Sequence, residues 1–390
     1  MGFLSAMIAL GVLLLTISLS GVLLLAQPPP GAPAAAISQP TPEPTPVVPT
    51  ATPFPPAGGS FGYGIQVHAY GRSDIADILA HVQDLRFGWV KQQLQWRDVE
   101  TNAKGQYNWD ALDVLVRSAN TAGLNLLLSV VKAPRWARPA TILCCEGPPV
   151  NPQDYGDFMR ALAARYNGKP GSLGKVAAYE IWNEQNIRGE WGGEPYDAAR
   201  YIELLKAGYT AVKSVDSDAV VVNGALTPAG TVVIGGIAYA AEDIGFLDQM
   251  YKLGLKNYAD VIGVHGATGS NLPPDADCYH LLPPTTEVFL GPCGGKRLWV
   301  TEFGWAVDPN PPPDRLYAKD NNLDKQARWT VQAYQLGRTS GWVGAMFLWN
   351  LNFKFSDPTG ETAMWGIVQP PNWTPLPVYE ALKNMPKDIR

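Results

Sequence analysis

The sequence predicts an α/β protein whose main domain, residues 61–390, is a single (β/α)8 TIM barrel. Eight short apolar segments rich in β-branched residues recur along the chain, and amphipathic stretches separate them. The roughly 330 residues that follow Ser60 suit one barrel of this kind. A doubly wound open sheet is the alternative, but no Gly-rich phosphate loop follows the first apolar segment.

The apolar segments have the length and composition of buried parallel strands. We expect strands at Gly62–Val67, Trp89–Leu94, Leu124–Val130, Val176–Trp182, Ala219–Asn223, Val261–His265, Leu298–Glu302 and Gly344–Trp349. We expect helices at Asp74–Arg86, Trp109–Ala122, Asp154–Tyr166, Pro195–Val215, Asn322–Gly337 and Leu376–Lys383. The helical pattern is least clear before the seventh strand.

Residues 1–26 have the composition of a membrane segment. Ala6–Ala26 is a run of 21 residues, mostly Leu, Ile, Val, Ala and Gly, and residues 1–60 contain a single charged side chain, Glu43. About 20 apolar residues span a bilayer as a helix, whereas the core of a cleaved signal peptide has about 7–15. No basic residue precedes the run, and no small-x-small cleavage site closes it. This favours an uncleaved hydrophobic helix that anchors the protein over a cleaved signal peptide.

Residues 27–60 read as a disordered Pro/Thr-rich linker. They hold 12 of the 35 prolines of the chain. Such a segment lacks amide donors, favours polyproline II and builds no packed core, so we expect a semi-rigid stalk. A ligand for the aromatic groove of a partner protein is the alternative. A hydrophobic anchor, a stalk and a domain together predict an extracytoplasmic protein held at the cell surface, or a secreted one if the first segment is cleaved.

The composition of the chain excludes several function classes. A formal net charge of −5 argues against a nucleic-acid partner, which requires a basic face. The four histidines show no paired metal-ligand spacing, so we expect no metal site. Thirteen Trp and 16 Tyr favour stacking on flat ligands such as sugar rings, although aromatic residues also fill cores.

In a (β/α)8 barrel the chemistry lies at the carboxyl ends of the strands. The fourth strand runs into Glu184 and the seventh into Glu302, each after a hydrophobic run where a solvated surface Glu is not expected. Two carboxyl groups, one acting as acid and one as nucleophile or base, cleave a glycosidic bond. The alternative is that one or both form ion pairs with basic residues at the barrel mouth. Aromatic neighbours (Trp182, Phe303 and Trp305) suit a carboxyl with a raised pKa.

Trp182-Asn183-Glu184 and Thr301-Glu302-Phe303-Gly304 resemble the acid/base and nucleophile motifs of the retaining glycoside hydrolases of clan A. The resemblance covers Phe61 to about Lys383, although only the strand ends are specific, and it is nearest to family 39 β-xylosidases and family 5 glycanases. It implies that Glu184 is the general acid/base, that Glu302 is the nucleophile and that Asn183 binds the sugar 2-hydroxyl. It further implies that Trp349 is a platform under the reacting sugar and that His265 lies in the active site.

Two positions depart from the clan pattern. The clan often has His-x-Tyr on the sixth strand, where this chain has Ala267 in place of the Tyr, and Tyr279 or His280 in the following loop are the candidates to replace it. The Arg common on the second strand is also missing, and Lys91 or Gln93 are the candidates there. These departures leave sugar and linkage specificity, and endo or exo action, open.

Other residues near the strand ends have two readings each. Trp136, after the third strand, either binds substrate or only supports its loop. His68, at the end of the first strand, either lines the mouth of the barrel or has a structural role. Strand alternation places Glu180 on the side of Glu184 but deeper, where we expect it to anchor a buried polar network. Glu190 and Trp191 are candidates to border the cleft.

The four cysteines support export rather than catalysis. Cys278 and Cys293 flank a Pro-rich loop that a disulfide would restrain. The adjacent Cys144 and Cys145 form either a vicinal bridge or a cross-link to that loop, and four free thiols are the alternative.

The sequence as a whole predicts a membrane-tethered retaining β-glycosidase that hydrolyses the O-glycosidic bonds of poly- or oligosaccharides by a two-glutamate double displacement. No cofactor is expected, because carboxyl groups supply all the chemistry. The oligomeric state is left open. A catalytically weak or inactive barrel that binds glycan through its aromatic mouth is the alternative.

Overall fold

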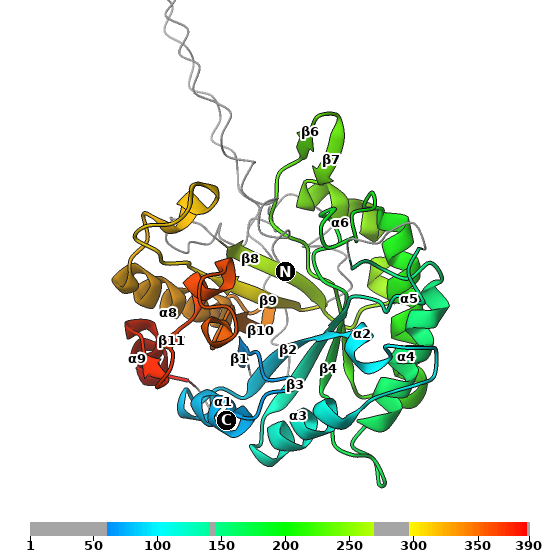
Figure 1. The fold of residues 1–390 in the computed structure, drawn as a ribbon, viewed down its shortest axis with the longest axis horizontal. Coiled ribbons are helices and arrows are strands. Elements are labelled where there is room, and N and C mark those ends of the chain that lie inside the picture. The colour runs from blue at the N-terminus through cyan, green and yellow to red at the C-terminus, as the bar shows by residue number, and fades with distance from the viewer. Residues whose placement is uncertain (1–60, 140–145, 269–295, 388–390) are drawn as a thin grey trace, which may run out of the picture.

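A computed structural model describes residues 61–139, 146–268 and 296–387 of the chain (Figure 1). The expected anchor (1–26), the linker (27–60), all four cysteines, Tyr279 and His280 lie outside the described residues, and so does most of the connection before the seventh barrel strand. Within the described part, no helix combines the length and the apolar character that crossing a bilayer requires.

Eight parallel strands form a nearly closed barrel with helices around it (Figure 1). In spatial order they are β5 (Val220–Asn223), β4 (Ala178–Ile181), β3 (Asn125–Val131), β2 (Trp89–Gln95), β1 (Gly62–Gln66), β10 (Val343–Leu348), β9 (Leu298–Gly304) and β8 (Ile262–Thr268). All eight strands expected from the sequence are present, with ends that differ by at most three residues. The predicted barrel is therefore confirmed.

The helices follow the expected order. They are α1 (Ile75–Asp84), α2 (Trp96–Val99), α3 (Asp110–Thr121), α4 (Pro152–Arg165), α5 (Ala198–Val215), α6 (Asp243–Lys252), α8 (Leu323–Thr339) and α9 (Pro377–Asn384). A capping side chain marks the start of α4, α5, α6 and α8. The α5 helix begins three residues later than expected, because Asp197 caps it by accepting a hydrogen bond from the Ala199 amide (2.8 Å). The sequence analysis missed α2 and α6.

The seam between β5 and β8 is closed by a side chain as well as by the backbone. One parallel bridge joins Val222 to Val261. The Asn223 side chain accepts from the Gly263 amide (3.0 Å) and donates to the Gly263 carbonyl (3.2 Å). A Cβ atom on residue 263 would lie 2.4 Å from the Asn223 carbonyl oxygen, so this close approach requires glycine.

A short antiparallel hairpin, β6 (Val232–Ile234) and β7 (Ile237–Ala240), extends from the barrel beside α6 (Figure 1). Its turn residues Gly235 and Gly236 have φ values of 58° and 80°, as a two-residue hairpin turn requires. The Gly-Gly pair between β-branched residues is a hairpin signal in the sequence that the sequence analysis missed. Small β11 (Val368–Gln369) and β12 (Thr374–Pro375) pair after the last barrel strand.

The interior of the barrel changes from apolar to polar along the strands. Nearer the amino-terminal ends of the strands, the interior is filled by an apolar layer with Trp89 packed against it. Its members are Leu127, Ala178, Val222, Trp299, Ala345 and Phe347. A polar layer lies two residues further along four of these strands, where the side chains again point inward. It consists of Lys91, Ser129, Glu180 and Thr301, all fully buried. This polar layer supports the carboxyl ends of the strands.

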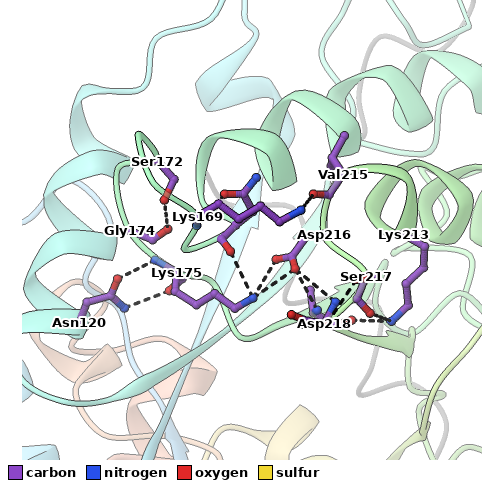
Figure 2. Close-up of polar contacts among 12 residues, drawn as sticks. Asn120, Lys169, Ser172, Gly174, Lys175, Lys213, Val215, Asp216, Ser217 and Asp218 are labelled. Atoms are coloured by element: carbon purple, nitrogen blue, oxygen red, sulfur yellow. Dashed lines mark hydrogen bonds and ion pairs between the residues drawn. The ribbon is translucent and has the colours of Figure 1, made fainter.

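The opposite end of the barrel is held by local polar contacts (Figure 2). The Lys175 ammonium, before β4, lies 3.0 Å from the carboxylate of Asp216, before β5. The Asn120 side chain exchanges two hydrogen bonds with the Lys175 backbone, at 2.7 and 2.9 Å. These contacts join the entry points of two neighbouring strands, which is the stabilising role expected at the amino-terminal end of such a barrel.

Candidate active site

Glu184, His265 and Glu302 come together at the carboxyl end of the barrel. Glu302 lies within β9, His265 lies within β8, and Glu184 follows β4 by three residues. One carboxylate oxygen of each glutamate and one ring nitrogen of His265 all lie within 4.8 Å of one another. The structure thus unites three residues that are 81 and 37 positions apart in the sequence.

A bulge in β9 directs Glu302 into the site. The strand register shifts by one residue against both neighbours here, so that Val264 pairs with Val300 but His265 pairs with Glu302. The extra residue is Thr301, whose hydroxyl donates to Glu180 inside the barrel (2.7 Å). Because of the bulge, the consecutive residues Thr301 and Glu302 both contact groups in the interior, which a regular strand does not allow.

The backbone around Glu184 adopts a conformation that is unfavourable for residues other than glycine. Trp182 has φ 74° and Glu184 has φ 45°, and each such residue costs of order 1–3 kcal/mol unless its surroundings impose it. The Glu184 amide donates to the Ala225 carbonyl (2.8 Å), and the Trp182 indole donates to the Glu190 carbonyl (3.1 Å). These contacts fix the position of the Glu184 carboxylate.

His265 bridges the two glutamates. Its Nδ1 lies 3.0 Å from Oε1 of Glu184, and its Nε2 lies 3.9 Å from Oε2 of Glu302. Burial opposes a charged imidazole, but the charge of Glu302 and the hydrogen bond and charge of Glu184 outweigh it and raise the pKa of His265 above its ordinary 6.5. The charged imidazole is thereby favoured, and its Nδ1 is placed to donate to Glu184.

The expectation of a raised carboxyl pKa is wrong for Glu184 in the protein without bound substrate. Burial pushes this pKa up, but the hydrogen bond and charge of His265 lower it below the ordinary 4.5. Two of the expected aromatic neighbours also pack elsewhere: the Phe303 ring lies 4.9 Å from that of Tyr334, and Trp305 lies 6.0 Å from Trp329. A proton at this position is shared between Glu184 and His265, whose Nδ1 and Oε1 atoms lie 3.0 Å apart.

Lys91 takes the place of the missing strand-two Arg. Its fully buried ammonium lies 2.8 Å from Glu302 Oε1 and 3.1 Å from Glu180 Oε2. Burial disfavours the charged amine, but the charges of Glu180 and Glu302 raise the pKa of Lys91. Glu180 lies deeper in the barrel than Glu302 and forms the buried network that strand alternation predicts.

Asn183 offers an unused polar atom beside the glutamates. It is 5% exposed, and its side-chain oxygen has no hydrogen-bond partner among the described residues. Buried polar atoms are rarely left unpaired in proteins, and binding of a hydroxylated ligand would satisfy this one.

Trp349 and His68 lie around one aromatic ring beyond the strand ends. The Phe353 ring is 4.8 Å from that of Trp349 and 5.6 Å from that of His68. Nδ1 of His68 is 2.6 Å from the Ser356 hydroxyl. Burial and the charge of Arg72 lower the pKa of His68, which favours the neutral imidazole.

Trp136 and Trp191 are both held by structural contacts. The Trp136 indole donates to the Glu100 carbonyl (2.9 Å), and its ring packs edge-on against Trp96 of α2 at 5.6 Å. Trp191 is fully buried and packs against Trp182 at 5.9 Å, so it belongs to the core and does not border a cleft. These contacts favour the supporting role for Trp136.

Glu190 is a third carboxyl group near the pair. Burial raises its pKa to about 7, opposed by the charge of Lys132 and reinforced by the charges of Glu184 and Glu302. The sequence analysis named it only as a possible edge of the cleft, because nothing in its local sequence shows the two other carboxylates nearby.

The same three residues have the donor atoms that a metal ion requires. Glu184, His265 and Glu302 each offer one ligand atom within reach of a common centre. Spacing along the chain does not indicate this group, because its members come from β8, β9 and the segment after β4. Lys91 already occupies Oε1 of Glu302, which leaves Oε2 for another partner.

Comparisons with solved structures find the same barrel in glycoside hydrolases. A family 39 glycoside hydrolase from Bacteroides cellulosilyticus is 21% identical with a TM-score of 0.59, over 83% of this chain and 62% of that one. A monomeric β-xylosidase from Caulobacter crescentus is 20% identical with a TM-score of 0.57, over 85% and 69%. Xylanase 10B from Thermotoga petrophila is 17% identical with a TM-score of 0.58, over 84% and 94%.

No protein-family model matches the sequence, and no curated protein matches it significantly. At these identities, the likeness to the solved structures shows that the chain shares the fold of clan A glycoside hydrolases, as its strand-end motifs predicted. The chain spans less than two thirds of the Bacteroides enzyme.

Proposed function

We propose that the protein is a retaining β-glycosidase in which Glu302 is the nucleophile and Glu184 the general acid/base. The observation that carries the proposal is the proximity of the two carboxylates, whose oxygens approach within 4.8 Å at the carboxyl end of a barrel that glycoside hydrolases share. Carboxyl groups about 5–5.5 Å apart are typical of retaining enzymes, whereas about 6.5–9.5 Å leaves room for the water of an inverting one.

In the first step, Glu302 attacks the anomeric carbon as the bond to the leaving oxygen breaks, and that oxygen takes a proton from the Glu184–His265 pair. A glycosyl ester on Glu302 results. In the second step, Glu184 removes a proton from water, the water oxygen attacks the anomeric carbon, and the Glu302 carboxylate leaves. Lys91 holds Oε1 of Glu302 throughout, so that Oε2 is free to attack.

The substrate class is a carbohydrate, and the alternative is a barrel that binds glycan without cleaving it. Asn183 and Trp349 are the proposed contacts to the reacting sugar. Hydrolysis of aryl β-glycosides of xylose, glucose, mannose and galactose, followed by determination of the product anomer, separates the two functions. A first-formed product with the β configuration supports retention, an α product contradicts the mechanism, and no hydrolysis of any sugar favours the binding protein.

The shared proton predicts an alkaline limit to activity. The pKa of His265 is raised, so the Glu184–His265 pair keeps its proton at pH 6.5 and releases it only at higher pH. We expect kcat/KM on an aryl glycoside to fall above this pH with an apparent pKa higher than 6.5. In His265→Gln, Glu184 holds the proton alone, and its pKa is then set by burial, which raises it, against the charge of Lys91, which lowers it. The alkaline limb should then move from its position in the parent, and an unmoved limb would exclude the shared proton.

We further propose that residues 1–60 act as an anchor and stalk that hold the barrel outside the cell membrane. Their single charge and their proline content support this layout. A protein of residues 61–390 is expected to be soluble and to keep the kcat/KM of the full-length chain in detergent. Aggregation or inactivity of the shortened protein alone would show that residues 1–60 belong to the folded domain.

A further inference from the structure

A pocket of about 420 Å³ lies between the start of α5 and α6. Tyr196, Phe246 and Ala241 contribute its apolar surface, while Glu194, Arg200 and Gln249 contribute polar groups. None of these residues belongs to the proposed catalytic group.

The wall of the pocket is continuous with the loop that carries Glu184. The Ala241 amide donates to the Asn186 carbonyl (2.9 Å), and the Asn186 side chain donates to the Ala241 carbonyl (3.1 Å). Asn186 stands two residues after Glu184. One edge of the pocket is therefore hydrogen-bonded to the segment that carries Glu184.

The aromatic side of the pocket is suited to the apolar face of a sugar ring. Tyr196 is half-buried, and its ring packs edge-on against that of Phe246, with centroids 6.1 Å apart at 75°. This contact holds Tyr196 in one orientation while part of its surface remains accessible. Rigid, partly exposed aromatic rings provide a large contact area at a low entropic cost.

The polar side of the pocket supplies both hydrogen-bond donors and hydrogen-bond acceptors, and its charged residues carry no net positive charge. The Arg200 guanidinium lies 2.6 Å from the Glu194 carboxylate, and both side chains are partly exposed. Asp197 adds a second negative charge at the pocket. A phosphate, sulfate or carboxylate ligand is disfavoured by this balance, whereas hydroxyl groups can donate to Glu194 and accept from Arg200 and Gln249.

We propose that this pocket is a second carbohydrate-binding site, which takes a neutral sugar residue of a chain whose cleavage occurs at Glu184 and Glu302. The inference rests on the proposed function in that it assumes a carbohydrate substrate, and it adds a second place on the barrel where a saccharide chain is bound. The pocket raises the affinity for long chains and has no part in bond cleavage.

The test compares long and short substrates in matched variants of the full chain. Tyr196→Ala removes the ring, Tyr196→Phe keeps it, and Tyr209→Ala removes a half-buried tyrosine further along α5 that packs against Tyr258 outside the pocket. The probes are β-1,4-linked hexasaccharides of xylose, glucose and mannose, with the aryl glycoside of each sugar as the short substrate. Affinity for the hexasaccharides is measured by calorimetry in the Glu302→Gln background, where cleavage is blocked.

We expect Tyr196→Ala to weaken hexasaccharide binding about five- to tenfold, while Tyr196→Phe and Tyr209→Ala remain within about twofold of the parent. Turnover of the aryl glycoside by Tyr196→Ala, with Glu302 restored, should be unchanged. Gln249→Ala provides a second variant that leaves the core intact, and it should also weaken binding.

Equal hexasaccharide affinity in Tyr196→Ala, Gln249→Ala and the parent would overturn the second site, and so would an equal loss in Tyr209→Ala. An absence of hexasaccharide binding to the parent overturns it as well. Failure of the proposed function would give a different result. Hexasaccharides would then still bind, and binding would depend on Tyr196, but no aryl glycoside would be cleaved.

Discussion

Replacing Glu302 with Gln is expected to lower kcat/KM on every cleaved glycoside by about four orders of magnitude or more. The amide cannot form the glycosyl ester, so the loss should not depend on the leaving group. The fold is expected to survive, because the amide retains an oxygen that can accept from Lys91, and Glu180 still pairs with the Lys91 ammonium. Steady-state kinetics on aryl glycosides with good and poor leaving groups, together with circular dichroism, check this result.

Replacing Glu184 with Ala should give a different defect. Aryl leaving groups that need little protonation should still leave, but no base activates water, so the glycosyl-enzyme should accumulate after an initial burst. Azide needs no base and is expected to restore turnover with a β-glycosyl azide as product. In Glu302→Ala, azide should instead displace the leaving group directly and give the α anomer.

The azide products assign the two roles independently of any likeness to other enzymes. The reverse pattern of anomers would exchange the roles of Glu184 and Glu302. Normal turnover by both variants would remove the two residues from the chemistry.

Replacing Lys91 with Met is expected to lower both stability and activity. Glu180 is fully buried and Glu302 nearly so, and Lys91 is the cation in contact with both. Leaving a buried charge without its partner costs about 3–5 kcal/mol in the free energy of unfolding. Glu302 also loses the hydrogen bond that orients it, so kcat should fall strongly. Denaturant unfolding and single-turnover kinetics measure the two effects.

A double variant separates stability from positioning. In Lys91→Met with Glu180→Gln, one positive and one negative buried charge disappear together, so most of the lost stability should return while kcat remains low. Lys91→Arg keeps the charge and tests whether the arginine common in clan A fits this barrel. Recovery of full activity in the double variant would show that Lys91 acts on Glu302 only through the stability of the fold.

Much of the fold was predictable because its signals are local. Runs of β-branched residues and amphipathic stretches give the strands and helices, and both depend on side chains near in sequence. The β6–β7 hairpin had such a signal in Gly235-Gly236. Parallel strands point in one direction, so the carboxyl ends that carry Glu184 and Glu302 had to meet at one end of the barrel.

The electrostatic state of the site was not predictable from neighbours in sequence. Trp182, Phe303 and Trp305 suggested an apolar setting for a carboxyl, but two of these rings pack against α8. The pKa of Glu184 depends instead on His265, which is 81 residues away in the sequence. Charge interactions act through space, and only the closed barrel brings these groups within hydrogen-bonding distance.

The sequence by itself therefore determined the barrel, its strand order along the chain and the two glutamates at the ends of the fourth and seventh strands. Only the tertiary structure decided that Lys91, rather than Gln93, contacts Glu302, and that His265 lies between the two carboxylates. The physical reason lies in the bulge at Thr301, which turns two consecutive side chains into the barrel. The bulge depends on how β9 pairs with the strands on both sides of it. This pairing register exists only once the barrel has closed.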